Sequence, residues 1–187
     1  MKRFAGFRAP AWGLLMWLAG APAVLPVRAD AQSRDERAVR AAYVFNLIKY
    51  VEWPGPEKEP VIGFTGDAAT GEVMERLLGG KASEGRTIRV VLYPSDEELE
   101  KCGVLYVAGA PTPEVRKALE KVKGRGVLTV GEAEGFARDG GMVGLVKSGD
   151  HIQLEVNLEA AQGSGIRISS RVLNLAEIVR PAGKGGS

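Results

Sequence analysis

Four short apolar runs alternate with helix-forming segments in the middle of this chain, and this alternation constrains the fold more than any other feature. Each run is apolar on both faces and is followed by turn residues such as Gly, Asp or Pro. Such strands are typical of a mainly parallel sheet that helices cover on both sides. The runs are residues 61–67, 87–93, 103–108 and 126–130, and the helical segments are residues 71–78, 95–100 and 112–122.

A hairpin is expected after these elements. Residues 142–146 and 151–156 are joined by a Lys-Ser-Gly-Asp connection, which favours an antiparallel turn. In the second segment alternate apolar side chains face the core, while the intervening ones, from His151 to Asn157, form a polar face.

A last helix is expected from Ser169 or Ser170 to about Val179, with Leu175 on its buried face. Together the segments predict an α/β fold. We expect a single domain with a mainly parallel central sheet of about six strands and helices on both faces, which is a three-layer α/β/α sandwich.

The first helix is expected at residues 34–52. Ser33 and Glu36 form a capping box that would start it. Pro54 has no amide hydrogen and disfavours helical geometry in the residue before it, so the helix should end close by.

The polar arc of this helix carries one aromatic residue, Phe45, close to Lys49. Two interpretations are open. Phe45 packs against a second element, or Phe45 and Lys49, with Trp53 at the helix end, form a contact surface for a partner, because exposed aromatic residues often anchor interfaces.

The N-terminus reads as a secretory signal peptide, residues 1–31. It has a positive leader, a short apolar run and small residues, Ala29 and Ala31, at the cleavage-determining positions. Cleavage after Ala29 is an alternative, and an uncleaved membrane anchor is another.

Charge and length describe what remains. Removing residues 1–31 takes four Lys or Arg and one Asp from 25 basic and 23 acidic residues, which leaves a charge near −1. This balance gives no electrostatic reason to expect nucleic-acid binding. We expect one α/β domain at residues 32–180 and a disordered tail at residues 181–187.

The chain lacks the residue sets that hydrolytic or metal chemistry needs. It has one His and one Cys, with no His-x-x-x-His, no paired Cys and no Gly-x-Ser-x-Gly. We therefore expect no enzyme activity, no metal and no cofactor. The turn at Gly66 and Asp67 is either half of a Rossmann-type nucleotide site or an ordinary turn. His151 is expected to be a solvated turn residue.

Cys102 is the only cysteine, which excludes an intramolecular disulfide. It opens an apolar run, so a buried and inert thiol is expected. An intermolecular disulfide would need Cys102 to be exposed.

A ligand site is predicted where the polar face of the hairpin meets the last helix. Glu155 and Asn157 project from the strand, and Arg167 and Ser169 stand at the helix entrance. An Arg beside a helix N-terminus favours a small anion. The alternative is an Arg167–Glu155 salt bridge that pins the helix to the strand.

Several segments together resemble the YfiR family of periplasmic proteins, also described as YfiR/HmsC-like, over residues 33–179. The matching segments include Ala-Ala-Tyr-Val-Phe-Asn-Leu-Ile-Lys-Tyr-Val-Glu-Trp-Pro at 41–54, Ile-Gly-Phe-Thr-Gly-Asp at 62–67, Cys-Gly-Val-Leu-Tyr-Val at 102–107 and Gly-Ile-Arg-Ile-Ser-Ser-Arg-Val-Leu at 165–173.

The resemblance implies a compact, often dimeric α/β protein in the periplasm of Gram-negative bacteria. Its best-known members hold an inner-membrane diguanylate cyclase inactive by binding that enzyme's periplasmic domain, and release raises cyclic di-GMP and promotes biofilm formation. Those members respond to redox state through several cysteines, whereas this chain keeps only Cys102. Family members are also linked to small ligands, including nucleotides, near the segment that matches Arg167 to Ser169.

Two functions are therefore expected. The first is repression of a diguanylate cyclase by direct contact, with Phe45, Lys49 and Trp53 as partner-binding residues. The alternative is a periplasmic module that binds a small molecule or nucleotide and serves a sensor kinase or a transporter. A homodimer and a small anionic ligand are further expected partners.

Overall fold

The computed structural model describes residues 27–55, 60–83 and 85–181, with side chains from residue 34 onward. Residues 1–26 of the predicted signal peptide and 182–187 of the predicted tail lie outside the described residues. The signal peptide, the domain bounds and the disordered tail therefore stay predictions.

Seven strands form one sheet in the order β11-β9-β8-β7-β6-β2-β5. Neighbouring strands are parallel except in the antiparallel β8–β9 hairpin. The mainly parallel sheet and the hairpin are thus confirmed, with one strand more than expected. The strands are β2 (Val61–Thr65), β5 (Arg89–Leu92), β6 (Val104–Val107), β7 (Leu128–Gly131), β8 (Val143–Ser148), β9 (His151–Val156) and β11 (Glu177–Ile178).

Two small antiparallel sheets lie beside the main one. The first pairs β1 (Val51–Glu52) with β10 (Arg167–Ile168), and the second pairs β3 (Ala82–Ser83) with β4 (Arg86–Thr87). The run predicted as one strand at residues 87–93 is therefore divided between β4 and β5.

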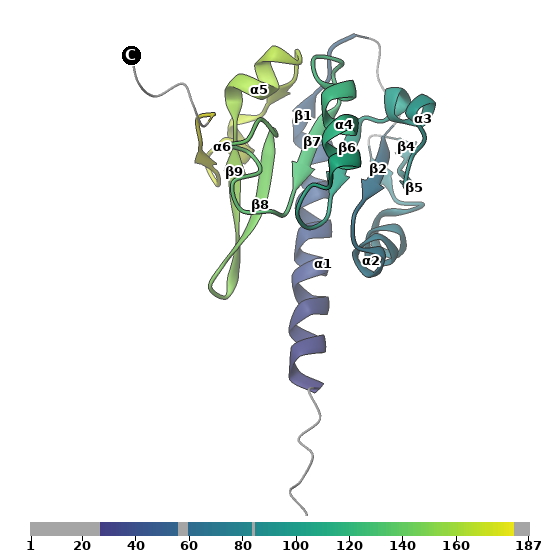
Figure 1. Ribbon diagram of the computed structural model, residues 1–187, viewed down its shortest axis with the longest axis vertical. Helices are drawn as coiled ribbons and strands as arrows, with labels where there is room; N and C mark the ends of the chain where they lie inside the picture. Colours follow the sequence, from purple (N-terminus) through teal and green to yellow (C-terminus); the bar gives the residue numbers. More distant parts are fainter. Residues whose placement is uncertain (1–26, 56–59, 84, 182–187) are drawn as a thin grey trace, which may run out of the picture.

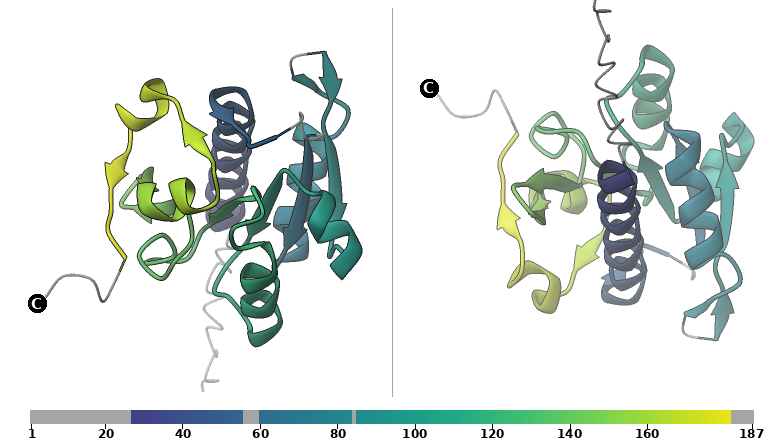
Figure 2. Two further views of the ribbon diagram at one scale, coloured as in Figure 1. Left: turned by 90° about the horizontal axis from the view of Figure 1, so that it is seen from above. Right: turned by 90° about the horizontal axis from the view of Figure 1, so that it is seen from below.

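Helices cover both faces of the sheet, as the fold class predicted (Figure 1; Figure 2). α1 (Val27–Tyr50) and α2 (Ala68–Leu78) lie over the larger core, and α3 (Asp96–Lys101) and α4 (Pro113–Val122) lie over the smaller core on the other face. Two short helices, α5 (Leu158–Gly163) and α6 (Ser170–Leu173), follow β9.

Strand β6 explains why the predicted strands are apolar on both sides. Tyr106 belongs to the core under α1, whereas Leu105 and Val107 belong to the core under α4. Successive side chains of a strand point to opposite faces, so a central strand between two helical layers needs apolar residues at every position. Tyr106 also stacks on Phe64 of β2, with ring centroids 5.7 Å apart.

Two of the predicted helix starts are confirmed, and a third differs. Ser95 forms a capping box with Glu98 at the start of α3, and Thr112 caps α4. The helix expected at residues 71–78 begins earlier, at Ala68. Its cap is Asp67, whose carboxylate accepts the amide hydrogen of Thr70 at 2.9 Å.

The predicted limits of the first helix are wrong. α1 begins at Val27, so Ser33 lies inside the helix and does not cap it. At the other end, the backbone leaves the helix after Tyr50, because Val51 and Glu52 pair with β10. This pairing, two residues before the predicted end, decides where the helix stops.

The predicted last helix is also wrong in its length. α6 spans only Ser170–Leu173, and Leu175 is 77% exposed where burial was expected. The chain continues as β11, which pairs with β9, and Val179 donates its amide hydrogen to Val156 O at 2.9 Å. Strand pairing on the open edge of β9 thus replaces the last turns of the helix.

We predict that Leu47→Ala lowers the free energy of unfolding by about 2–5 kcal/mol, as expected for a Leu truncated in a well-packed core. Leu47 is 1% exposed and lies on the buried side of α1. Urea denaturation followed by circular dichroism measures the change. The control is Asn46→Ala, at an exposed position of the same helix, which should change stability by less than about 0.5 kcal/mol. Equal losses in both variants would contradict burial of this side of α1.

Candidate partner-binding surface

The pairing of β1 with β10 brings the end of α1 to the segment before α6 (Figure 2). Val51 lies opposite Ile168 and Glu52 opposite Arg167. The amide hydrogen of Ser169 is donated to Tyr50 O at 2.9 Å. Two groups of residues that are far apart in the sequence therefore share one surface.

Phe45 is only partly buried, and it contacts the larger core with its inner side. The ammonium group of Lys49 lies 4.7 Å from the centre of its ring, and that of Lys81 lies 5.4 Å from it. Cations over aromatic faces are attracted by the ring quadrupole. The packing interpretation of Phe45 is thus confirmed. The partner-binding interpretation stays a prediction, with two cations now placed beside the ring.

A second cation–aromatic pair lies at the end of the same helix. The Arg171 guanidinium carbon is 5.7 Å from the centre of the Tyr50 ring. Arg167 is exposed and forms an ion pair with Glu52, with nitrogen and oxygen 2.6 Å apart. We name these residues the basic aromatic surface: Phe45, Lys49, Tyr50, Lys81, Arg167 and Arg171.

The charged members of this surface contribute little to the stability of the fold. The side chains of Arg167 and Glu52 are 81% and 69% exposed, and exposed ion pairs stabilise proteins by only about 0–1 kcal/mol. The fold therefore does not require this concentration of cations, which makes it a candidate for binding.

Trp53 lies next to the surface but points inward. Its indole Nε1–H donates to Gly103 O at 3.0 Å, and the ring packs against the larger core. A small hollow lies beside Trp53 and is shared with Pro60 and Arg86. Trp53 thus fixes the chain that leaves α1 against the start of β6.

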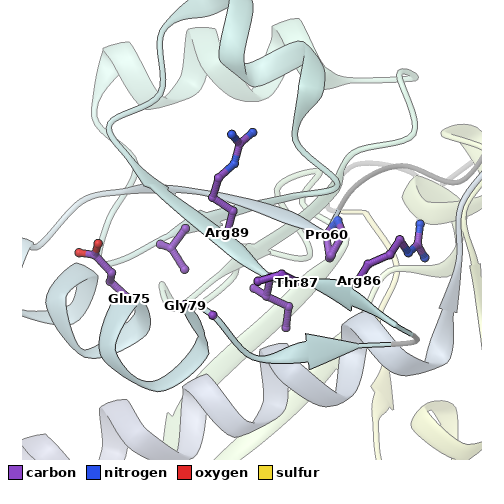
Figure 3. Close-up of a pocket in the computed structure, with 9 residues that line it drawn as sticks. Pro60, Glu75, Gly79, Arg86, Thr87 and Arg89 are labelled. Carbon is purple, nitrogen blue, oxygen red and sulfur yellow. The ribbon is translucent and has the colours of Figure 1, made fainter.

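A groove of about 780 Å³ continues from this hollow along the edge strand β5 (Figure 3). Arg86 and Pro60 line both the hollow and the groove. Gly80, also in the groove, precedes Lys81 of the basic aromatic surface. Glu75, Arg86 and Arg89 line the groove, which therefore carries charges of both signs.

The residues of the predicted ligand site contact different neighbours. Glu155 is buried and pairs with Arg138 at 3.5 Å, and Arg138 also contacts Glu177 of β11 at 3.0 Å. Arg167 pairs with Glu52 instead. The expected Arg167–Glu155 salt bridge is therefore wrong. Its cause is that β10 pairs with β1 and not with β9.

Asn157 and Ser169 both serve as helix caps. Asn157 is fully buried; its Oδ1 accepts the Ala160 amide hydrogen at 3.0 Å, and its Nδ2 donates to Ala137 O at 2.8 Å. The Ser169 hydroxyl oxygen accepts the amide hydrogen of Arg171 at 3.3 Å. Of the four predicted ligand residues, Arg167 and Ser169 lie by the basic aromatic surface, and Glu155 and Asn157 belong to the hairpin region.

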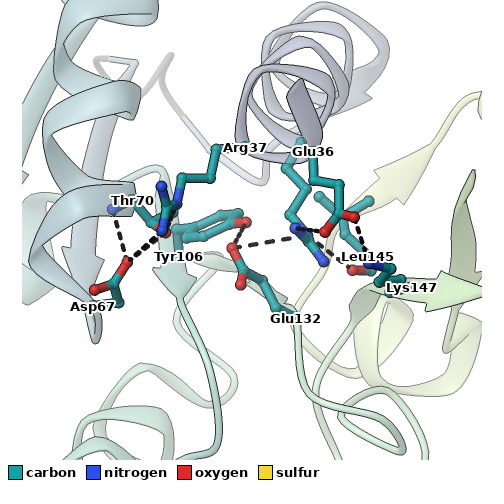
Figure 4. Close-up of polar contacts among 9 residues, drawn as sticks. Glu36, Arg37, Asp67, Thr70, Tyr106, Glu132, Leu145 and Lys147 are labelled. Carbon is teal, nitrogen blue, oxygen red and sulfur yellow. Dashed lines mark hydrogen bonds and ion pairs between the residues drawn. The ribbon is translucent and has the colours of Figure 1, made fainter. Parts of the chain in front are cut away.

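The Gly66–Asp67 turn makes the contacts of an ordinary tight turn. A Cβ atom on Gly66 would lie 2.1 Å from Ala108 O. The Asp67 carboxylate accepts the amide and hydroxyl hydrogens of Thr70 at 2.9 and 2.8 Å, and Arg37 lies 3.8 Å away (Figure 4). These contacts support the ordinary turn.

Figure 4 also shows how α1 is held over the carboxyl ends of the strands. Arg40 is buried, lies 3.9 Å from both Glu36 and Glu132, and donates to Leu145 O at 3.4 Å. The Tyr106 hydroxyl donates to Glu132 at 2.5 Å. Burial, together with the negative charge of Glu132, raises the pKa of Tyr106 far above its ordinary value, so the hydroxyl stays protonated. This network fills the crevice where open α/β sheets usually bind ligands.

Cys102 and His151 lie where the sequence predicted. Cys102 is buried, and its thiol lies 3.2 Å from Glu98 O, to which it donates. His151 is exposed at the start of β9, opposite Ser148. Burial of the thiol supports the inert state.

A family model described as YfiR/HmsC-like matches residues 37–177 of this sequence. The chain belongs to the YfiR/HmsC-like family. The family consists of periplasmic regulatory proteins of the diguanylate cyclase system, and it is regulatory rather than catalytic. No helix in the described part of the chain is long and apolar enough to span a bilayer.

Two solved structures share the fold of this YfiR/HmsC-like chain. One is an ABC domain in complex with L-Trp from Streptococcus pneumoniae, with 14% identity and a TM-score of 0.52, covering 74% of this chain and 62% of that one. The other is a conserved domain protein from Vibrio cholerae O1 biovar El Tor, with 14% identity and a TM-score of 0.51, covering 76% and 59%. This chain thus spans about three fifths of each structure, and the likeness concerns the fold alone.

Sequence reasoning missed three members of the surface. These are Tyr50, Lys81 and Arg171. Arg171 lies four residues after Arg167, a spacing that could have marked a shared basic segment. No signal in the sequence could have linked Lys81 to Phe45.

We predict that Thr70→Val raises the pKa of Asp67, but not fully to the ordinary value of 3.8. The Thr70 hydroxyl and amide hydrogen bonds both lower this pKa, and the variant removes only the first. NMR titration of the Asp67 carboxyl carbon measures the shift. The Glu114 pKa, which Thr112 helps to lower, should not move.

The same titration has a consequence for stability. A lowered folded-state pKa means that the Asp67 contribution is present above the unfolded value and is lost as pH falls through the folded value. The free energy of unfolding of the wild type should therefore fall more than that of Thr70→Val as the pH drops below about 3.8. An Asp67 pKa that is unchanged in the variant would contradict the cap geometry.

Proposed function

We propose that this protein represses an inner-membrane diguanylate cyclase by binding the cyclase's periplasmic domain through the basic aromatic surface. Family membership supports the proposal, because the YfiR/HmsC-like family belongs to the diguanylate cyclase system. The observation that carries the proposal is the set of cation–aromatic pairs at the end of α1, Lys49 and Lys81 on Phe45 and Arg171 on Tyr50.

The chemistry of this surface defines the partner. Interfaces are enriched in aromatic side chains and Arg, which give large contact areas and directed hydrogen bonds. The positive charge favours a partner face that carries Asp and Glu, and complementary charge speeds association and selects the partner. Binding through it should weaken as ionic strength rises.

The buried thiol bears on the release signal. The thiol of Cys102 is 0% exposed, and thiol–disulfide exchange needs an accessible thiolate. We therefore propose that release from the cyclase follows a signal other than oxidation of Cys102. A homodimer, implied by the family resemblance, remains part of the proposal.

We predict that Lys49→Glu/Arg171→Glu abolishes capture of the cyclase. The tagged mature protein, with wild type and variant side by side, is used to retrieve partners from its own membranes in mild detergent, with mass spectrometry as readout. Cyclic di-GMP should rise in cells that carry the variant. The matched control is Lys117→Glu/Lys123→Glu, which reverses two exposed charges on the opposite helical layer and should retain capture.

Phe45→Ala provides a second test within the same experiment. It removes the aromatic ring and keeps both Lys49 and Lys81, so loss of capture with an intact circular dichroism spectrum would identify the ring as an anchor. A wild-type bait that retrieves no cyclase, or charge reversals that leave capture unchanged, would overturn the proposal.

A second candidate function is a periplasmic small-molecule sensor that serves a kinase or a transporter. Four residues were predicted to bind its ligand, and each of them contacts different neighbours. What favours this candidate is a different feature, a cavity of about 760 Å³ between α4 and α5, a size typical of small-molecule sites.

A further inference from the structure

The cavity between α4 and α5 is lined in part by α4. Helix α4 covers the face of the sheet opposite α1 (Figure 1). None of the residues of the basic aromatic surface lines the cavity. Its lining comes from α4, from β7 and the following loop of residues 132–141, and from α5. It is therefore separate from the proposed partner-binding surface.

The cavity lies beside the start of the contact between β7 and β8. These strands pair only at Val130–Val143 and Gly131–Gly144. One residue earlier, the Thr129 hydroxyl oxygen accepts the Met142 amide hydrogen at 3.0 Å, so a side chain takes the place of a strand partner. Both Thr129 and Met142 are buried and line the cavity. The opening is thus built into the backbone and does not depend on a mobile side chain.

One apolar wall is fixed by close packing. Phe136 is 3% exposed, and its ring lies against two glycines. A Cβ atom would come within 2.4 Å of the ring at Gly131 and within 2.2 Å at Gly141. Only glycine leaves room for the ring at these positions. Leu119 of α4 and Ala160 of α5 complete an apolar lining around Phe136 and Met142.

The rim of the cavity is acidic. Glu134 and Asp139 of the loop, with Glu159 of α5, are exposed at its edge, and Arg116 of α4 lies on the other side. Lys123 and Glu120, also at the rim, form an ion pair at 3.7 Å. Glu134 and Asp139 of the loop thus lie at the same rim as one guanidinium, that of Arg116, and the charge of the rim favours a cation.

We propose that this cavity binds a small organic cation, an amine with an apolar body. The apolar part lies against Phe136 and Met142, and the ammonium group lies between Glu134 and Asp139. In a periplasmic regulatory protein such a ligand is a chemical signal that reaches the protein from outside the cell. The proposal concerns binding by the isolated protein and stands whether or not the basic aromatic surface binds a cyclase.

The test uses two aromatic probes of similar size and opposite charge, 2-phenylethylammonium and 3-phenylpropanoate, titrated into the mature protein and followed by amide NMR shifts. The ammonium probe should give saturable shifts at Ala133, Gly141 and Ala160. The carboxylate probe should bind at least about fivefold more weakly. Equal binding of both probes, or shifts only at residues outside the cavity, would overturn the proposal.

Two variants locate the binding. Glu134→Gln/Asp139→Asn should raise the dissociation constant of the ammonium probe at least about fivefold, whereas Glu72→Gln/Glu97→Gln, which removes two exposed carboxylates elsewhere, should leave it unchanged. Gly141→Ala should move the Phe136 ring into the cavity and weaken both probes. If Gly141→Ala fails to fold, the exposed charge variants still decide the outcome, and unchanged binding in Glu134→Gln/Asp139→Asn contradicts the proposed site.

Discussion

The structure depends first on the burial of one side of α1 against the sheet. The residues of this side are at most 5% exposed: Ala41, Val44, Leu47 and Ile48. Burying side chains of this kind contributes about 1.5–3 kcal/mol for each large apolar residue. Burial of this side fixes where α1 ends relative to the sheet. At that end β1 pairs with β10. The basic aromatic surface is a consequence of that pairing, because it brings Arg167 and Arg171 to the outer side of α1.

The two ends of α1 have different chemistry for a physical reason. Near Arg40 the helix crosses the carboxyl ends of the strands, where Glu132 and Tyr106 must be paired because burial without partners is costly. That network fills the usual ligand crevice of an open α/β sheet. Near Tyr50 the polar groups are exposed and few of them are needed for folding. The two candidate binding sites are therefore the basic aromatic surface at the end of α1 and the cavity between α4 and α5.

These two places match the needs of a regulatory protein. A repressor needs a surface for its partner and a means to receive a signal, and the signal must bind the free and engaged states with different affinity to shift the balance between them. In this chain the buried Cys102 leaves no accessible thiol in the described domain to receive an oxidative signal. The cavity by Phe136 lies in a separate layer, joined to the α1 side through the central strands β6 and β7.

The sequence by itself determined the fold class, the parallel strands and the caps at Ser95 and Thr112, because these follow from local periodicity and from side-chain chemistry within a few residues. It also predicted that Cys102 is buried, since that residue opens an apolar run, and the structure confirms this burial. Only the tertiary structure decided where α1 ends, that Glu177 and Ile178 form a strand, and that Arg167 pairs with Glu52 and not with Glu155. Each of these depends on which backbone edge is open and on which segment reaches it, and strand pairing between distant segments leaves no periodic signal in the sequence.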